Sequence, residues 1–210
     1  MSTTRARRIV LSGCDGSGKS TIALALASVL SRRRKTSLSW LRGSHLHVSL
    51  LYRFLSRFSA FKGPDNPYYG VSVPENLKHL FSVLEFAGFL PQLFARWLRG
   101  LYSDYLVCDR GVLDFLAWVV ATLKYAKFLN SLLGRFLLAL SAKEAPIVLA
   151  ASLNTLAARA DVPLEFLARE YAIYSVLQKY VSRCTVDTSS TTPLEALKKV
   201  LECLSTRSAT

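Results

Sequence analysis

Short apolar runs alternate along this chain with longer segments whose apolar residues recur at helical spacing. Five of the short runs have the length and the apolar or β-branched content of strands, namely residues 8–12, 36–41, 105–108, 145–151 and 183–187. Helical patterns cover residues 22–30, 46–61, 74–99, 112–128, 130–141, 164–180 and 193–204, with a bend expected at Pro91. A strand–helix series with short connections predicts an α/β fold, a five-stranded parallel sheet with helices on both faces.

The 210 residues suit a single domain, 1–210, because no internal repeat and no linker composition interrupts the series. Residues 62–70 (KGPDNPYYG) break the periodicity and are expected to form a long, turn-rich loop. Such a loop is either a plain connection or, with its two tyrosines, a lip over a base-binding pocket. The sequence leaves both interpretations open.

The first predicted strand ends in a glycine-rich turn, GCDGSGKST at residues 13–21, which leads into a helix. Gly13, Gly18, Lys19 and Ser20 occupy every fixed position of the G-x-x-x-x-G-K-[ST] phosphate-loop pattern. Backbone N–H groups of the turn and of the first helical turn form a cradle for a polyphosphate. Lys19 is expected to reach the β- and γ-phosphates of ATP, and the Ser20 hydroxyl to bind Mg²⁺. The predicted ATP-binding residues of this loop are Gly13, Cys14, Asp15, Gly16, Ser17, Gly18, Lys19, Ser20 and Thr21.

A polar pair, Asp109 and Arg110, follows the apolar strand predicted at 105–108. Ligands of open α/β sheets bind at the carboxyl ends of the strands, so this pair is a candidate site. Asp109 would hold Mg²⁺ or its water, and the planar guanidinium of Arg110 would bind an acceptor phosphate. A purely structural ion pair is the alternative. By the same argument Arg42 and Ser44, after the second strand, are candidate substrate contacts.

The composition excludes a disordered chain, since 51% of the residues are hydrophobic and 20% are charged. Cysteines at positions 14, 108, 184 and 203 lack C-x-x-C spacing, which indicates reduced thiols with neither a zinc site nor a disulfide. The N-terminus carries no apolar segment of a signal peptide. Together these features predict a cytoplasmic protein.

Residues 112–140 are very apolar and raise the question of a membrane span. Asp114, Lys124, Lys127 and Arg135 interrupt the segment, so no run reaches the ~20 apolar residues that a bilayer requires. Two buried helices are expected instead, without membrane contact. Any part of this surface that is not buried within the subunit would form a homodimer interface.

The formal net charge is +13, and most of the excess lies near the phosphate loop. Residues 1–64 contain twelve Lys or Arg and one acidic residue. This region would attract nucleotide polyphosphates or nucleic acid, or it is a solvated face, which we favour for residues 32–35 at the end of the first helix. Nucleic acid is not an expected partner, because no nucleic-acid-binding motif is present. His45 and His47 are expected to be loop or surface residues rather than a metal pair.

Three motifs, in order and spacing, resemble the thymidylate kinase family of nucleoside monophosphate kinases: GCDGSGKST at 13–21, Asp109-Arg110 after a short strand, and VDTS at 186–189 before a terminal helix. The resemblance covers essentially the whole chain and implies a P-loop NTPase fold. It implies that Asp15 contacts the acceptor sugar, that Arg110 holds the acceptor phosphate, and that Arg42 lies near it. It also implies a lid at about residues 155–170 that closes on ATP, with Arg159 or Arg169 as its arginine.

The chain departs from the pattern of that family at three places. Gly111 stands where an aromatic residue or a histidine commonly borders the sugar. Residues 84–89 (LEFAGF) lack the phosphate-binding arginine that members often carry in the third helix, for which Arg96 or Arg99 is the candidate replacement. Gly16 stands where some members have a catalytic arginine.

The motifs and the resemblance together predict an ATP-dependent kinase that acts on a nucleoside 5′-monophosphate and converts dTMP to dTDP. The predicted catalytic residues are Lys19, Asp15, Asp109 and Arg110, and the expected substrate contacts are Asp15, Arg42, Phe81 (by stacking on the base) and Arg110. ATP and Mg²⁺ are the expected cofactors, with Ser20 and Asp109 as metal ligands, and a homodimer is expected because members of the family are commonly dimers. Two alternatives stay open: a P-loop kinase for another nucleotide or a small metabolite, and a basic nucleic-acid-associated ATPase without kinase activity.

Overall fold

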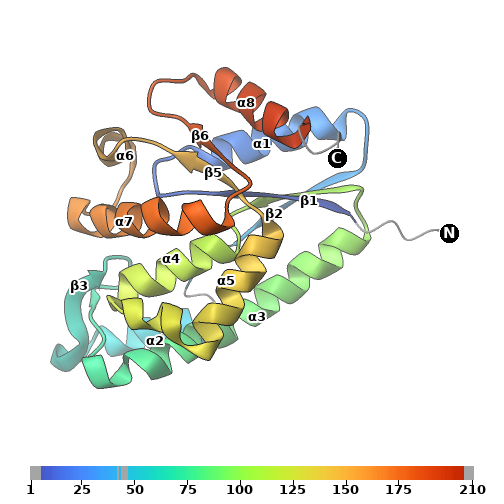
Figure 1. The fold of residues 1–210 in the computed structure, drawn as a ribbon. Coiled ribbons are helices and arrows are strands. Elements are labelled where there is room, and N and C mark those ends of the chain that lie inside the picture. Colours follow the sequence, from blue (N-terminus) through green and yellow to red (C-terminus); the bar gives the residue numbers. More distant parts are fainter. Residues whose placement is uncertain (1–5, 42, 44–46, 206–210) are drawn as a thin grey trace.

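Five parallel strands form the central sheet of the computed structural model, which describes residues 6–41, 43 and 47–205 (Figure 1). They are β1 (Arg7–Ser12), β2 (Thr36–Trp40), β4 (Tyr105–Asp109), β5 (Ile147–Ala150) and β6 (Cys184–Asp187), in the order β2-β4-β1-β5-β6. Every strand pair is parallel, and β1 lies between β4 and β5. The predicted five-stranded parallel sheet is therefore confirmed.

Helices cover both faces of the sheet, as predicted. Figure 1 shows α1 and α8 on one face and α3, α4, α5 and α7 on the other. The helices in the described part of the chain are α1 (Lys19–Ser31), α2 (His47–Leu55), α3 (Lys78–Leu101), α4 (Val112–Leu123), α5 (Leu132–Glu144), α6 (Leu153–Arg159), α7 (Leu164–Val181) and α8 (Pro193–Ser205), with 3₁₀ turns at Ser59–Phe61, Glu75–Leu77 and Ala126–Asn130.

The central strand shows why the sequence forms these layers. Successive side chains of a strand point to opposite faces, so Ile9 and Leu11 pack with Leu26 of α1 and Leu197 of α8. Val10 between them belongs to a separate apolar cluster with Leu106 of β4. A strand buried on both faces reads as a continuous apolar run, which is what residues 9–11 are.

Some predicted boundaries are wrong. The helix expected over 112–128 ends at Leu123, because Lys124 adopts a left-handed backbone conformation with φ of 46°. The helix expected over 46–61 ends at Leu55. The loop expected over 62–70 contains a short strand, β3 (Lys62–Asn66), which lies outside the main sheet and bridges to Val71.

The apolar segment 112–140 is mostly interior. All twelve residues of α4 are buried, because α4 packs against α3, α5 and α7. The first half of this segment therefore does not form the surface on which the sequence placed a homodimer contact. In the second part of the segment, Leu132 and Phe136 of α5 are exposed, and a larger set of exposed apolar side chains lies on α3, at Leu80, Val83, Leu90, Phe94, Trp97, Leu98 and Leu101. Within the described ranges, no helix combines the length and the apolarity that crossing a membrane requires.

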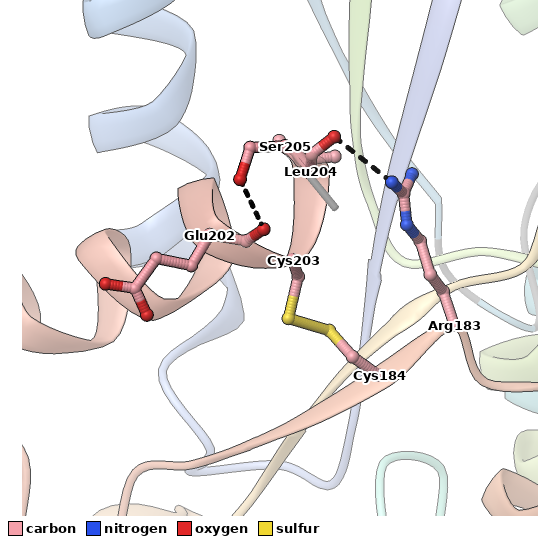
Figure 2. Close-up of a disulfide and its surroundings, with 6 residues drawn as sticks. All are labelled: Arg183, Cys184, Glu202, Cys203, Leu204 and Ser205. Atoms are coloured by element: carbon pink, nitrogen blue, oxygen red, sulfur yellow. Dashed lines mark hydrogen bonds between the residues drawn. A yellow bond between two sulfur atoms is a disulfide. The ribbon is translucent and has the colours of Figure 1, made fainter. Parts of the chain in front are cut away.

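The prediction of four reduced cysteines is wrong for one pair. Cys184, the first residue of β6, forms a disulfide with Cys203 in the last turn of α8, with 6.4 Å between the Cα atoms (Figure 2). Beside it the Arg183 guanidinium donates to the Leu204 carbonyl over 3.2 Å. The two cysteines are 19 positions apart and meet only because α8 folds back over the sheet. The cysteines therefore no longer support a cytoplasmic location, which stays a prediction.

Candidate active site

The phosphate loop connects β1 to α1 and owes its shape to glycine. Gly16 and Gly18 have φ of 81° and 86°, which other residues rarely adopt. A Cβ at Gly13 would lie 2.3 Å from the Leu149 carbonyl oxygen. Gly18 caps α1 without a side chain, so the N–H groups of the first helical turn face the loop. The predicted strand, loop and helix start lie where the sequence placed them.

Lys19 is folded onto this loop. Its Nζ donates to the Gly13 carbonyl over 2.7 Å and to the Cys14 carbonyl over 2.6 Å, and the side chain is buried. Burial and the nearby Arg110 lower the pKa of Lys19, and neighbouring carboxylates oppose them. Ser20, the next residue, is exposed at the start of α1. The Lys19 ammonium group is thus buried, whereas Ser20, which carries the hydroxyl, lies at the surface.

Asp15 and Arg110 form the centre of the site. Arg110 Nη2 lies 2.5 Å from Asp15 Oδ1, and the Tyr68 hydroxyl donates to Asp15 Oδ2 over 2.6 Å. Burial raises the pKa of Asp15, but the charges of Arg110 and Lys19 and these hydrogen bonds outweigh burial and lower it to about 2. Asp15 is therefore ionised at neutral pH. The sequence placed both residues at the acceptor, and the structure brings them together.

Two buried carboxylates that the sequence analysis did not assign support this pair. Asp114 Oδ1 accepts from the Tyr174 hydroxyl over 2.7 Å and lies 3.9 Å from Arg110 Nη1. Asp114 Oδ2 accepts from the Gly111 N–H over 2.7 Å, as an acid in the first turn of α4 does. Its position three residues after Gly111 is the signal that could have identified Asp114.

Glu170 of α7 is the second of these carboxylates. Its Oε2 accepts from the Asp15 N–H over 3.2 Å, and the side chain is buried. Burial, and next the charge of Asp15, raise the pKa of Glu170 to about 7. No motif surrounds Glu170 in the sequence, so only the fold reveals it.

Arg96 holds the turn that carries Arg110. Its Nη2 donates to the Arg110 carbonyl over 2.5 Å, and its Nη1 lies 3.5 Å from Glu144 Oε1. The Glu144 carboxylate also accepts from the Val112 N–H over 2.9 Å. Arg96 is fully buried and does not line a cavity beside the loop. Arg96 thus contacts the turn of Arg110, and its role as a replacement for a phosphate-binding arginine stays a prediction.

The departure at Gly111 has a steric cause. A Cβ there would lie 2.4 Å from Val10 Cγ1 and 2.8 Å from Glu144 Oε2. Both distances are shorter than van der Waals contact, so a side chain at position 111 would require the side chains of Val10 and Glu144 to move. The close approach of these two side chains thus favours glycine at this position.

A small cavity of about 20 Å³ lies beside the pair of Asp15 and Arg110. This volume holds about one water molecule. It is lined by Asp15, Leu41, Gly43, Tyr68, Phe89, Arg110, Gly111, Asp114, Phe115, Trp118 and Glu170. Phe81, the predicted stacking residue, packs instead with Tyr52 and Phe61, because its position on α3 faces that aromatic cluster.

The aromatic residues at the small cavity are different ones. The rings of Tyr68 and Trp118 lie 5.3 Å apart between centroids, and those of Phe89 and Phe115 are stacked at 4.1 Å. Tyr68 comes from the loop of residues 62–70, and it lies over the cavity with its hydroxyl on Asp15. This arrangement favours the interpretation of that loop as a lip rather than a plain connection.

A larger cavity, of about 280 Å³, lies on the other side of the phosphate loop. It is lined by Ser17, Gly18, Thr21, Ile22, Arg159, Thr188, Thr191, Pro193 and Ala196. Arg159 closes α6 and donates from Nη1 to the Thr188 carbonyl over 3.1 Å. The other candidate of the predicted lid, Arg169, is not here, since its Nη1 lies 3.6 Å from Asp65 Oδ1 and its Cζ 5.5 Å from the centre of the Phe166 ring.

Of the remaining candidate residues, the structure describes Asp109 and His47 but not Arg42, Ser44 or His45. Asp109 ends β4, and its buried Oδ1 has no hydrogen-bond partner in the part of the chain that the structure describes. A buried carboxylate oxygen of this kind fits a metal ion or its water. Arg42, Ser44 and His45 lie outside the described residues, and His47 begins α2.

Comparisons with solved structures find proteins of similar fold. The thymidylate kinase of Candida albicans aligns over 97% of this chain and 93% of its own, with a TM-score of 0.62 and 16% identity. This chain shares the thymidylate kinase fold. The thymidylate kinase of Ehrlichia chaffeensis aligns over 95% and 99% of the two chains, with a TM-score of 0.52 and 15% identity. No protein-family model and no curated protein matches the sequence.

A third solved structure of similar fold belongs to a different kind of kinase. The deoxyadenosine kinase of M. mycoides, with bound dCTP, aligns over 95% of this chain and 100% of its own, with a TM-score of 0.51 and 18% identity. The three proteins share the architecture, although two are thymidylate kinases and the third is a deoxyadenosine kinase. The P-loop NTPase fold predicted from the sequence is confirmed.

Proposed function

We propose that the protein is an ATP-dependent kinase that transfers the γ-phosphoryl group to a nucleoside 5′-monophosphate, with dTMP as the preferred acceptor. The observation that carries the proposal is that one phosphate loop borders two cavities, each with an arginine. Ser17 lines the cavity that contains Arg159, and Asp15 lines the cavity that contains Arg110. A donor phosphate on the loop would therefore face a separate acceptor site with its own guanidinium.

The donor nucleotide is assigned to the 280 Å³ cavity. The loop N–H groups and the α1 N-terminus would bind its phosphates, and the Lys19 ammonium would exchange the Gly13 and Cys14 carbonyls for phosphate oxygens. Arg159 at the cavity wall would contact the nucleotide from the side of α6. The predicted lid of residues 155–170 would close here, and its closure would exclude water.

Magnesium would be held by the Ser20 hydroxyl and by Asp109 or its water. The exposed hydroxyl at the start of α1 and the buried, unpartnered Oδ1 of Asp109 fit this assignment. When bound, Mg²⁺ neutralises part of the phosphate charge.

The acceptor is assigned to the cavity beside Arg110. The guanidinium would bind the acceptor phosphate, while Asp15 would contact the sugar and hold Arg110 in place. The transfer itself needs alignment and charge neutralisation more than covalent chemistry. Entry of a nucleotide requires Tyr68 to swing off Asp15, since the cavity now has room for only about one water.

Trp118 and Phe89 at this cavity give a base flat surfaces to contact, which supports a nucleotide acceptor. The thymidylate kinases of the same fold make dTMP the first choice. A kinase for another nucleotide or a small metabolite is the second candidate, and the small volume of the cavity favours it. Arg42 stays a predicted contact near the acceptor phosphate.

A homodimer would form through α3 rather than through α4. Residues 80, 83, 87, 90, 94, 97 and 101 are separated alternately by three and four positions, the spacing of a helix that packs lengthwise on another helix. Most of these side chains are large, apolar and exposed, and no charged residue interrupts the stripe. A second copy of α3 is the surface with matching spacing. Light scattering should give twice the chain mass, and Phe94→Lys should give monomers, with Leu132→Lys on α5 as the control.

The test of the kinase proposal is ADP release from ATP and Mg²⁺ with each common nucleoside monophosphate in turn. Lys19→Ala is the blank, and product analysis identifies the diphosphate. Turnover with dTMP alone supports the proposal in full, and turnover with another monophosphate supports the second candidate. If nucleic acid stimulates ADP release and no monophosphate does, both are wrong.

A further inference from the structure

A third cavity, of about 330 Å³, lies between α7 and the carboxyl ends of β5 and β6. We call it the α7 groove. It is separate from the donor and acceptor cavities, although Gly13 and Cys14 of the phosphate loop form one wall. Its other lining residues are Val148, Leu149, Ala150, Ala151, Ser152, Tyr171, Tyr174, Ser175, Gln178, Asp187 and Ser189.

The groove arises because the edge strand β6 is only partly covered on this face. Val186 packs in the layer of α1 and α8, and the next residue, Asp187 at the end of β6, lines both the groove beside α7 and a cavity toward Lys199 of α8. Small residues, such as Ala150 on the sheet and Ser175 on α7, leave this space open. Its volume falls within the range of small-molecule sites.

The chemistry of the groove differs from that of the two nucleotide cavities. Among its described lining residues there is no Lys, Arg or His, whereas Arg159 and Arg110 line the other two cavities. Asp187 is the charged residue of the lining. Hydrogen bonds from Ser189 lower the pKa of Asp187, so this carboxylate is negative at neutral pH.

We propose that the α7 groove binds an organic cation with a flat, apolar body. The side chains of Val148 and Ala150 offer an apolar floor, Tyr171 offers an aromatic wall, and Asp187 offers the counter-charge at the rim. A cation at the face of a tyrosine and near a carboxylate is attracted by both. A phosphate group would find no cationic side chain among the described lining residues, so the groove favours a cation over an anion. The site goes beyond the proposed kinase activity and does not depend on it.

Isothermal titration calorimetry of the full chain tests the proposal with two probes of equal shape and opposite charge, benzamidine and benzoate. We expect benzamidine to bind at least about tenfold more tightly, because attraction to Asp187 replaces repulsion. Asp187→Asn should weaken benzamidine binding about threefold, as expected for a partly solvated charge. Asp161→Asn, at an exposed acid outside the groove, is the matched control and should not change it.

A second variant locates the site. Ser175→Phe places a ring into the groove and should abolish benzamidine binding, while Val176→Phe, at the exposed neighbouring position on α7, should leave it intact. Saturation with ATP should not compete. The proposal is wrong if benzamidine fails to bind at millimolar concentration, if benzoate binds as well, if Ser175→Phe has no effect, or if ATP displaces the probe. Because the readout is binding, it is independent of whether the protein transfers phosphoryl groups.

Discussion

Arg110 and Asp15 are 95 positions apart in the sequence, and their side chains meet with 2.5 Å between Nη2 and Oδ1. Asp15 follows β1 and Arg110 follows β4, and the parallel pairing of these neighbouring strands brings their carboxyl ends together. A guanidinium has five N–H donors, so Arg110 can stay paired with Asp15 and still offer donors to a phosphate. The pair thus serves as an anchored anion site beside the phosphate loop.

Replacing Arg110 should therefore remove acceptor-phosphate stabilisation. We expect Arg110→Ala to lower kcat/KM for the nucleoside monophosphate by at least ~100-fold, the scale of one lost electrostatic contact in the transition state. Arg110→Lys should restore little, because an ammonium lacks the planar fork. Steady-state ADP release measures the effect, and Arg135→Ala, at an exposed arginine of α5, should be normal. Near-normal activity of Arg110→Ala would contradict the assigned role.

The Tyr68 hydroxyl competes with the acceptor for Asp15, since it donates to Oδ2 over 2.6 Å. We expect Tyr68→Phe to lower the KM for the acceptor about fivefold with little change in kcat, because one hydrogen bond no longer has to be broken on entry. Tyr180→Phe, at an exposed tyrosine of α7, is the control. A higher KM in Tyr68→Phe would mean that the hydroxyl helps to bind the acceptor.

The sequence predicted those parts of the site that repeat a local pattern. The functional residues of the phosphate loop lie within eight consecutive positions, and Asp109-Arg110 follows a strand that is apolar throughout. Parallel pairing then fixes which edge of the sheet both occupy. These features need no tertiary information beyond the strand order.

Features that depend on the approach of distant segments could not be predicted. Glu170 is one acid on a long helix, and its role comes from the contact with the Asp15 N–H. The sequence predicts that α4 is buried, but only packing shows that the apolar stripe of α3 is exposed. Phe81 lies on the correct helix for a stacking residue but faces a different aromatic cluster.

Glu170 should make stability depend on pH. Its pKa is raised to about 7 in the folded protein from 4.5. Between these values the folded state keeps a proton that the unfolded state has lost, so the free energy of unfolding falls as pH rises from about 4.5 to about 7. Glu170→Gln should reduce this fall by roughly 1 to 3 kcal/mol. Urea unfolding at a series of pH values measures it, with Glu165→Gln at an exposed acid as the control.

Reduction of the Cys184–Cys203 disulfide should destabilise the fold. The bond closes a loop of 19 positions, for which the loss of chain entropy on unfolding predicts about 3 kcal/mol of stabilisation. For a chain of this size the melting temperature should fall by roughly 6 to 12 °C on addition of reductant. Differential scanning calorimetry measures the shift. The same loop carries Thr188 and Thr191 of the donor cavity, so the KM for ATP should rise together with the loss of stability.

Two controls separate the disulfide from other effects of the reductant. Cys203→Ser should melt at the temperature of the reduced protein, and reductant should not lower it further, because Cys14 and Cys108 are already free. Thiol titration of the denatured protein should find two thiols before reduction and four after it. Four thiols in the untreated protein, with no change in melting temperature on reduction, would mean that this pair is not bonded in solution. Two thiols with an unchanged melting temperature would mean instead that the bond forms but does not stabilise the closing helix α8 against the sheet.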